Sequence, residues 1–236
     1  NFIGCDQLIF IESSKSTDAN LKFFNSDGGE SGACGNGTRC IAKLISNETK
    51  NETVILTTLN GNLKSQILEN NIVTTEIGNA KIEWNEIPLS EKLDTKNLNI
   101  KIIDVNDKEY FGGTAVNVGN PHVIFFVDKI ENFNIEKIGP QVENYNIFPE
   151  NCNVTIAKIV DKNLIQVKVW ERGAGLTKAC GTAACATAFA GKLNNLTENK
   201  TDIEFQTGKL SILIDDKNSI HMKGPVSEIK EIEFKL

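Results

Sequence analysis

The stretch SGACGNGTRCIAKL occupies residues 31–44, and GLTKACGTAACATA occupies residues 175–188. Each contains Ala-Cys-Gly, followed by small residues, a second cysteine and a run that favours helix. A repeat this short, at two places far apart in the chain, predicts two halves that are built alike and face each other. We therefore ask what two such cysteines do together.

Composition limits the class of protein. The chain has 236 residues, of which 40% are hydrophobic and 24% charged, which is enough to bury a sizeable core. Its 25 Lys and Arg residues stand against 31 Asp and Glu residues, a formal net charge of -6. Without a basic run, nucleic acid and anionic membrane are poor partners. No stretch approaches the roughly 18 apolar residues of a membrane span, so we expect a soluble protein.

The chain begins with Asn1 and enters directly on NFIGCDQLIFIE, which reads as the middle of a structure, so we expect that an N-terminal segment precedes it. Six cysteines are few for a disulfide scaffold of this length. The composition therefore favours reduced thiols and a cytoplasmic location.

Coarse patterning favours strands. β-Branched runs broken by turn residues cover residues 7–12, 52–78, 110–120, 122–130, 153–171 and 211–224. Helices are predicted at residues 37–46, 182–193 and, more briefly, 131–145. The small residues after Cys180 suit a helix that is wrapped by sheet. We therefore predict an α/β (α+β) fold of two similar domains, each a curved, mostly antiparallel sheet around a central helix.

The six cysteines differ in their expected roles. Free cysteine is often buried, and we expect Cys5, Cys40, Cys152 and Cys185 to fill apolar space. A zinc site is a weaker alternative, because the cysteine spacings are C-x5-C and C-x4-C and only the second approaches a typical zinc knuckle.

Cys34 and Cys180 each stand between Ala and Gly at the expected entrance to a helix. Unpaired N–H groups and the helix dipole there stabilise a thiolate, so we expect both thiols to have a pKa below about 8.5. Two acid/base groups on opposite faces of one carbon are what stereoinversion requires, since one removes the proton and the other delivers a new one.

Ordered sequence blocks extend the pattern over nearly the whole chain. They are IGCDQL (3–8), FNSDGGESGACGNGTRC (24–40), VNVGNPHVIFFV (116–127), FPENCNV (148–154), WERGAGLTKACGTAACA (170–186) and KGP (223–225). On these blocks the chain resembles the diaminopimelate epimerases, cofactor-independent enzymes of lysine and peptidoglycan synthesis. The resemblance implies interconversion of LL- and meso-diaminopimelate, with no cofactor and no metal.

The resemblance also implies roles for individual residues. Cys34 and Cys180 match the catalytic cysteines of the family. The positions that match its substrate-binding residues are Gln7, Asn25, Gly35, Asn36, Asn120, Asn153, Glu171, Arg172, Gly181 and Thr182. The guanidinium of Arg172 suits a distal carboxylate, which it can grip bidentately. His122, together with Glu171, is implied to set cysteine protonation, although a purely structural histidine is the alternative.

The family's architecture implies an N-terminal domain of residues 1–79 and 226–236 and a C-terminal domain of residues 80–225. Residues 228–234 would form a strand that returns to the first domain, and the family suggests a homodimer. A proline or hydroxyproline racemase would share the cysteine pair, but a monocarboxylate needs no distal clamp such as Arg172. A phenazine-type isomerase lacks the cysteine pair. A catalytically inactive binding module and a zinc-stabilised structural protein are the non-enzymatic alternatives.

Overall fold

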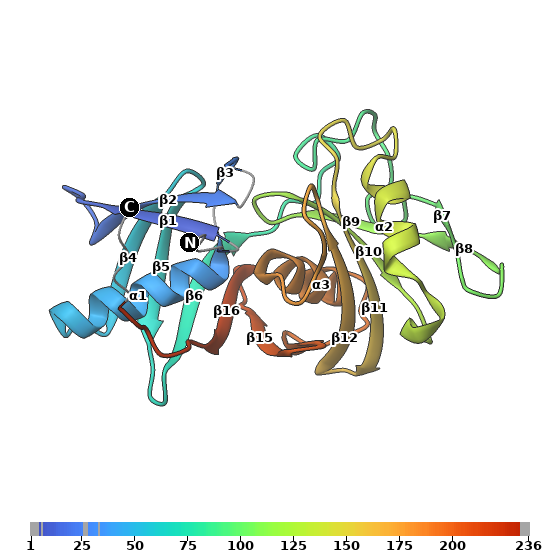
Figure 1. Ribbon diagram of the computed structural model, residues 1–236. Coiled ribbons are helices and arrows are strands. Elements are labelled where there is room, and N and C mark those ends of the chain that lie inside the picture. Colours follow the sequence, from blue (N-terminus) through green and yellow to red (C-terminus); the bar gives the residue numbers. More distant parts are fainter. Residues whose placement is uncertain (1–4, 6, 26–27, 33, 232–236) are drawn as a thin grey trace. The chain divides into compact units, whose positions relative to one another are not determined.

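The computed structural model describes residue 5 and residues 7–25, 28–32 and 34–231. By its internal contacts the chain divides into two units, residues 1–76 with 223–236 and residues 77–222. Each unit combines a sheet with a helix (Figure 1). The mixed α/β fold rich in strands that the sequence predicts is thus confirmed.

The first unit places helix α1 (Gly35–Thr49) against strands β4 and β5. Its strands are hydrogen-bonded in the order β1-β2-β4-β5-β6, with β3 paired to β2. Their bounds are β1 Gln7–Glu12, β2 Ala19–Asn25, β3 Glu30–Ser31, β4 Thr53–Thr58, β5 Gly61–Ile67 and β6 Ile72–Asn79. Buried Phe23, Leu56 and Val73 from three of the strands pack in one cluster with Ala42 and Ile45 of α1.

The second unit contains α2 (Ile135–Glu143) and α3 (Gly181–Leu193), and its main sheet runs in the order β16-β15-β14-β12-β11-β10-β9. Strand β13 pairs with β12, and β7 and β8 form a separate hairpin. The bounds are β7 Ile100–Ile103, β8 Glu109–Gly112, β9 Thr114–Asn117, β10 Pro121–Phe126, β11 Asn153–Asp161, β12 Leu164–Glu171, β13 Gly175–Thr177, β14 Lys200–Phe205, β15 Gly208–Ile214 and β16 Ser219–Pro225. A short 3₁₀ helix, η1, covers Ile130–Asn132.

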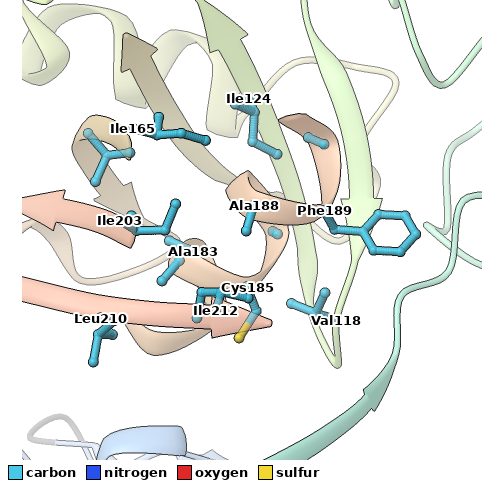
Figure 2. Close-up of a cluster of buried hydrophobic side chains, with 14 of the residues drawn as sticks. Val118, Ile124, Ile165, Ala183, Cys185, Ala188, Phe189, Ile203, Leu210 and Ile212 are labelled. Atoms are coloured by element: carbon cyan, nitrogen blue, oxygen red, sulfur yellow. The ribbon is translucent and has the colours of Figure 1, made fainter. Parts of the chain in front are cut away.

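Helix α3 is buried almost all round, as its small residues predict. Residues 183–191 are all buried. Figure 2 shows Ile165, Ile203 and Ile212 from the surrounding strands packed around this helix. Alanine at five of the thirteen positions of α3 lets the strands approach the helix closely, so the helix serves as the core of its unit.

Each α-helix lies within the connection between two strands that pair in parallel, a feature that was not predicted from the sequence. Helix α1 connects β2 to β4, α2 connects β10 to β11, and α3 connects β12 to β14, and each of these three strand pairs is parallel. Parallel neighbours need a long crossover connection, which a helix supplies. The two Ala-Cys-Gly segments therefore both stand where such a crossover enters its helix.

The helix predicted at residues 131–145 and the strand predicted at residues 228–234 differ from the structure. The helix expected at residues 131–145 is interrupted, because Asn134 caps the start of α2 by accepting hydrogen bonds from the backbone N–H groups of Glu136 and Lys137. Residues 226–231 are not in a strand, and the rest of the strand expected at residues 228–234 lies outside the described residues. The chain does return to the first unit, where Val226 is buried and donates its N–H to Asn71 O at 2.9 Å.

In the part of the chain that the structure describes, no helix is long and apolar enough to cross a membrane.

Candidate active site

The two repeated cysteines have the same backbone conformation. Cys34 is the N-cap of α1, with φ -136° and ψ 108°, and Cys180 is the N-cap of α3, with φ -135° and ψ 118°. Extended angles of this kind are usual for the residue that precedes the first helical turn. The repeat in sequence is thus a repeat in structure, with a thiol at the start of each helix.

The surroundings of the two thiols differ. The Cys34 side chain is half-buried, and its Sγ accepts a hydrogen bond from Gly37 N at 3.3 Å. Cys180 is only 5% exposed, and its Sγ lies 3.4 Å from Thr182 Oγ1. Gly35 and Gly181 follow the two cysteines as buried first residues of their helices, and Asn36 and Thr182 come next and are half-buried.

The expected low pKa of the second thiol is wrong. Burial raises the pKa of Cys180 well above its usual value, and the nearby Glu171 carboxylate raises it further. The Thr182 hydroxyl and the backbone N–H of Ala183 act in the opposite direction and lower the pKa. The stabilisation expected at a helix start is therefore present, but loss of water around the sulfur outweighs it.

His122 and Asn153 lie opposite each other on the parallel strands β10 and β11. His122 is fully buried, and its Nε2 is 2.9 Å from Asn120 Oδ1. Burial lowers the pKa of His122 to about 3, and the positive charge of Arg172 acts in the same direction. The imidazole is therefore neutral at physiological pH.

Asn153 links this strand pair to Arg172. Its side chain is buried, its Nδ2 donates to Pro121 O at 2.9 Å, and its Oδ1 accepts from Arg172 N at 3.0 Å. The Arg172 side chain is exposed, and its Nη1 donates to Glu150 O at 2.7 Å. A guanidinium carries five N–H groups, so this bond leaves donors for a ligand carboxylate.

The predicted site residues of the first unit lie on β1, β2 and α1. Gln7 and Asn25 are partners in the register of the antiparallel pair β1 and β2. The Asn36 side chain accepts a hydrogen bond from Arg39 Nη2 at 3.0 Å through its Oδ1. Cys34, Gly35 and Asn36 are consecutive at the start of α1.

The remaining cysteines only partly follow the prediction. Cys152 and Cys185 are fully buried, as expected, and burial raises the pKa of the Cys152 and Cys40 thiols. Cys40 is half-buried. Cys5 is exposed, which corrects the expectation that it fills apolar space; it stands just before β1, an end strand of the sheet whose side chains are mostly exposed.

Glu143, the last residue of α2, was not among the residues predicted from the sequence. It is 8% exposed, and its carboxylate accepts hydrogen bonds from Trp170 Nε1 at 2.7 Å and from Gly173 N at 2.9 Å. Nothing in the polar segment that surrounds it in the sequence marks this glutamate as buried.

The fold is shared with proteins of known structure. A phenazine biosynthesis protein of the PhzF family from Bacillus anthracis matches with a TM-score of 0.64 at 16% identity, covering 98% of this chain and 86% of that one. A hydroxyproline epimerase from Agrobacterium vitis matches with a TM-score of 0.65 at 12% identity, covering 93% and 71%. At these identities the likeness defines the fold alone.

Sequence relatives define the family within that fold. The family model described as diaminopimelate epimerase matches residues 1–83 and 114–229. A diaminopimelate epimerase of Pelagibacter ubique is 64% identical over 236 residues, which is 100% of this chain and 86% of that protein. One from Acidiphilium cryptum is 39% identical over 232 residues, covering 98% and 82%. The chain belongs to the diaminopimelate epimerase family.

Proposed function

We propose that this protein interconverts LL- and meso-diaminopimelate, with Cys34 and Cys180 as the two acid/base groups. Inversion of one carbon requires a base on one face and an acid on the other. The observation that carries the proposal is the matched pair of helix N-caps, because two structurally equivalent thiols suit two equivalent proton transfers. Membership in the diaminopimelate epimerase family supplies the substrate.

The protonation state of Cys180 indicates which cysteine acts as the acid and which as the base in the first turnover. Its raised pKa means that this thiol holds its proton at physiological pH. We therefore infer that Cys34 removes the α-proton first and that Cys180 delivers a proton to the opposite face. After this step Cys34 carries a proton and Cys180 has lost one, so Cys180 serves as the base for the reverse reaction.

The helix starts supply charge stabilisation. The backbone N–H groups of a first helical turn, here those of Gly35 and Asn36 and of Gly181 and Thr182, have no acceptor within their own helix. Such donors and the helix dipoles favour an anion, so we propose that they hold the reacting α-carboxylate. Negative charge develops there when the α-proton leaves, and preorganised donors lower the barrier.

The distal end of the substrate determines specificity. We propose that Arg172 binds the distal carboxylate and that Gln7, Asn25 and Asn120 contribute polar contacts. Asn153 holds the Arg172 backbone, and Glu171 and His122 adjust the electrostatics of the site. The enzyme would act in the cytoplasm as a homodimer, without a metal or an organic cofactor.

Chiral chromatography tests this proposal. The full-length protein is incubated with LL-diaminopimelate without added metal or pyridoxal phosphate, and we expect meso-diaminopimelate to accumulate until the two forms reach equilibrium. L-Proline should remain unchanged, because it has no distal carboxylate for Arg172. Folded protein that leaves LL-diaminopimelate intact, or that racemises proline instead, would contradict the proposal.

A further inference from the structure

The hairpin between β12 and β13 carries two of the proposed site residues. Glu171 pairs with Gly175 across the hairpin, and residues 172–174 form the loop. Gly173 has φ +73°, a left-handed conformation that glycine adopts without strain. The hairpin thus places Glu171, at the end of β12, beside Cys180, and Arg172 is the first residue of the loop.

Each backbone N–H group of this loop has a hydrogen-bond acceptor. Arg172 N donates to Asn153 Oδ1 at 3.0 Å, and Ala174 N donates to Glu171 O at 3.0 Å. Gly173 N donates to Glu143 Oε1 at 2.9 Å. Two of the three acceptors are therefore side-chain atoms of other elements, which fix the loop from outside.

The Glu143 carboxylate also holds the residue that precedes the hairpin end. Its second oxygen, Oε2, accepts from Trp170 Nε1 at 2.7 Å. The Trp170 ring lies against α2 at Gly139, where an added Cβ would stand 2.7 Å from Trp170 Cβ, and it lies near Gly175 on the other strand. A buried carboxylate that accepts two N–H bonds has a fixed orientation.

We propose that Glu143 is a positioning residue of this site, whose carboxylate fixes the end of the hairpin that carries Glu171 and Arg172. The proposal deepens the function proposed above and rests on it. Glu143 acts through the loop: without its carboxylate, Gly173 N and Trp170 Nε1 lose a shared acceptor, and the loop can move. Arg172 would then lose its alignment to the distal carboxylate, and Glu171 would withdraw from Cys180.

Two measurements on the full-length protein test this role. The first is steady-state kinetics of Glu143→Ala with diaminopimelate, where we expect kcat/KM to fall by about tenfold or more, mainly through a higher KM, since small misplacements of substrate-positioning groups are costly. The matched control is Val142→Ala, which removes a buried side chain from the neighbouring position of the same helix. It should lower the melting temperature and leave KM unchanged.

The second measurement needs no turnover. The groups that act on the Cys180 thiol are the Glu171 carboxylate, the Thr182 hydroxyl and the Ala183 N–H, and Glu143 is not among them. If Glu171 withdraws, the pKa of Cys180 falls. The rate at which iodoacetamide alkylates Cys180 is therefore measured by mass spectrometry at several pH values. We expect the pH dependence of this rate to shift to lower pH in Glu143→Ala. A tenfold gain in alkylation rate at one pH corresponds to about one pKa unit. Val142→Ala should keep the wild-type profile.

Two milder variants test the same role if Glu143→Ala does not fold. Glu143→Gln keeps the size of the side chain and one acceptor, and Trp170→Phe removes the indole donor and part of the ring but leaves Glu143 in place, so both should show the same changes at smaller size. Wild-type KM and a wild-type Cys180 profile in these variants, or equal changes in Val142→Ala, would overturn the positioning role. If the wild-type protein does not turn over diaminopimelate, the proposed function fails, whereas the alkylation profile still decides the role of Glu143.

Discussion

Replacement of Gly139 by alanine tests the packing that supports the site. Gly139 lies inside α2, and an added Cβ would stand 2.5 Å from Trp170 Cδ2 and 2.7 Å from Trp170 Cβ. Carbon atoms in contact are about 3.5–4.0 Å apart, so the helix or the indole must move by about 1 Å. The indole cannot yield freely, because its Nε1 is bonded to Glu143 at 2.7 Å.

Two effects of this substitution oppose each other. Overpacking of a core costs about 1–3 kcal/mol, whereas alanine in a helix interior gains up to about 1 kcal/mol over glycine. Because the clash involves Trp170 Cβ and ring atoms close to the backbone, we expect the cost to approach the upper end of its range. The net loss should be about 1–2 kcal/mol of unfolding free energy, which lowers the melting temperature by about 2–8 °C.

Differential scanning calorimetry measures this change, with Gly112→Ala as the matched control in the same unit. No atom lies within 4 Å of an added Cβ at Gly112, so that variant should melt close to the wild-type temperature. In a Trp170→Ala background the added cost of Gly139→Ala should fall to less than half. A Gly139→Ala protein that melts at or above the wild-type temperature would refute the packing argument.

Arg172→Lys keeps the charge but loses the bidentate grip, so kcat/KM for diaminopimelate should fall roughly 30- to 150-fold, a loss of about 2–3 kcal/mol in transition-state stabilisation. Near-normal kinetics would show that Arg172 does not bind the substrate. His122 has a pKa of about 3 when folded and about 6.5 when unfolded. Between these values the unfolded state binds more protons, so stability falls as pH decreases, by about 2 kcal/mol from pH 6.5 to 5. Urea titrations at several pH values give the unfolding free energy as a function of pH, and this free energy should change less steeply with pH in His122→Gln than in the wild type. An identical pH dependence would contradict a buried neutral imidazole.

Much of the fold follows from local patterning. The β1 strand was predicted with its observed bounds, and the helix around Cys185 within one residue, because alternation, turn residues and a run of small residues act locally. The strands β2, β7 and β14 were missed, since their alternating side chains are short runs among polar residues. Parallel pairing around the helices depends on contacts between distant segments, which no local pattern encodes.

The place of the two repeated cysteines at helix starts was predictable from the sequence, and their electrostatics were less so. Ala-Cys-Gly at a helix entrance located both N-cap thiols, since capping is a local property. The pKa direction of Cys180 was wrong, because it depends on how deeply the tertiary fold buries the sulfur and on Glu171 nearby. Glu143 was missed for the same reason, as only the packing of α2 against β12 reveals that its carboxylate is buried.

The opposed-thiol mechanism is tested most directly by the deuterium content of the first product formed from LL-diaminopimelate in D2O. If Cys34 removes the α-proton and Cys180 delivers another from the opposite face, the earliest meso-diaminopimelate carries deuterium at the inverted carbon, and recovered substrate carries little. Either cysteine replaced by alanine should then abolish epimerisation, because half of the acid/base pair is gone. Early product that retains the hydrogen of the substrate, or substrate that exchanges as fast as product forms, would contradict two separate thiols at one carbon.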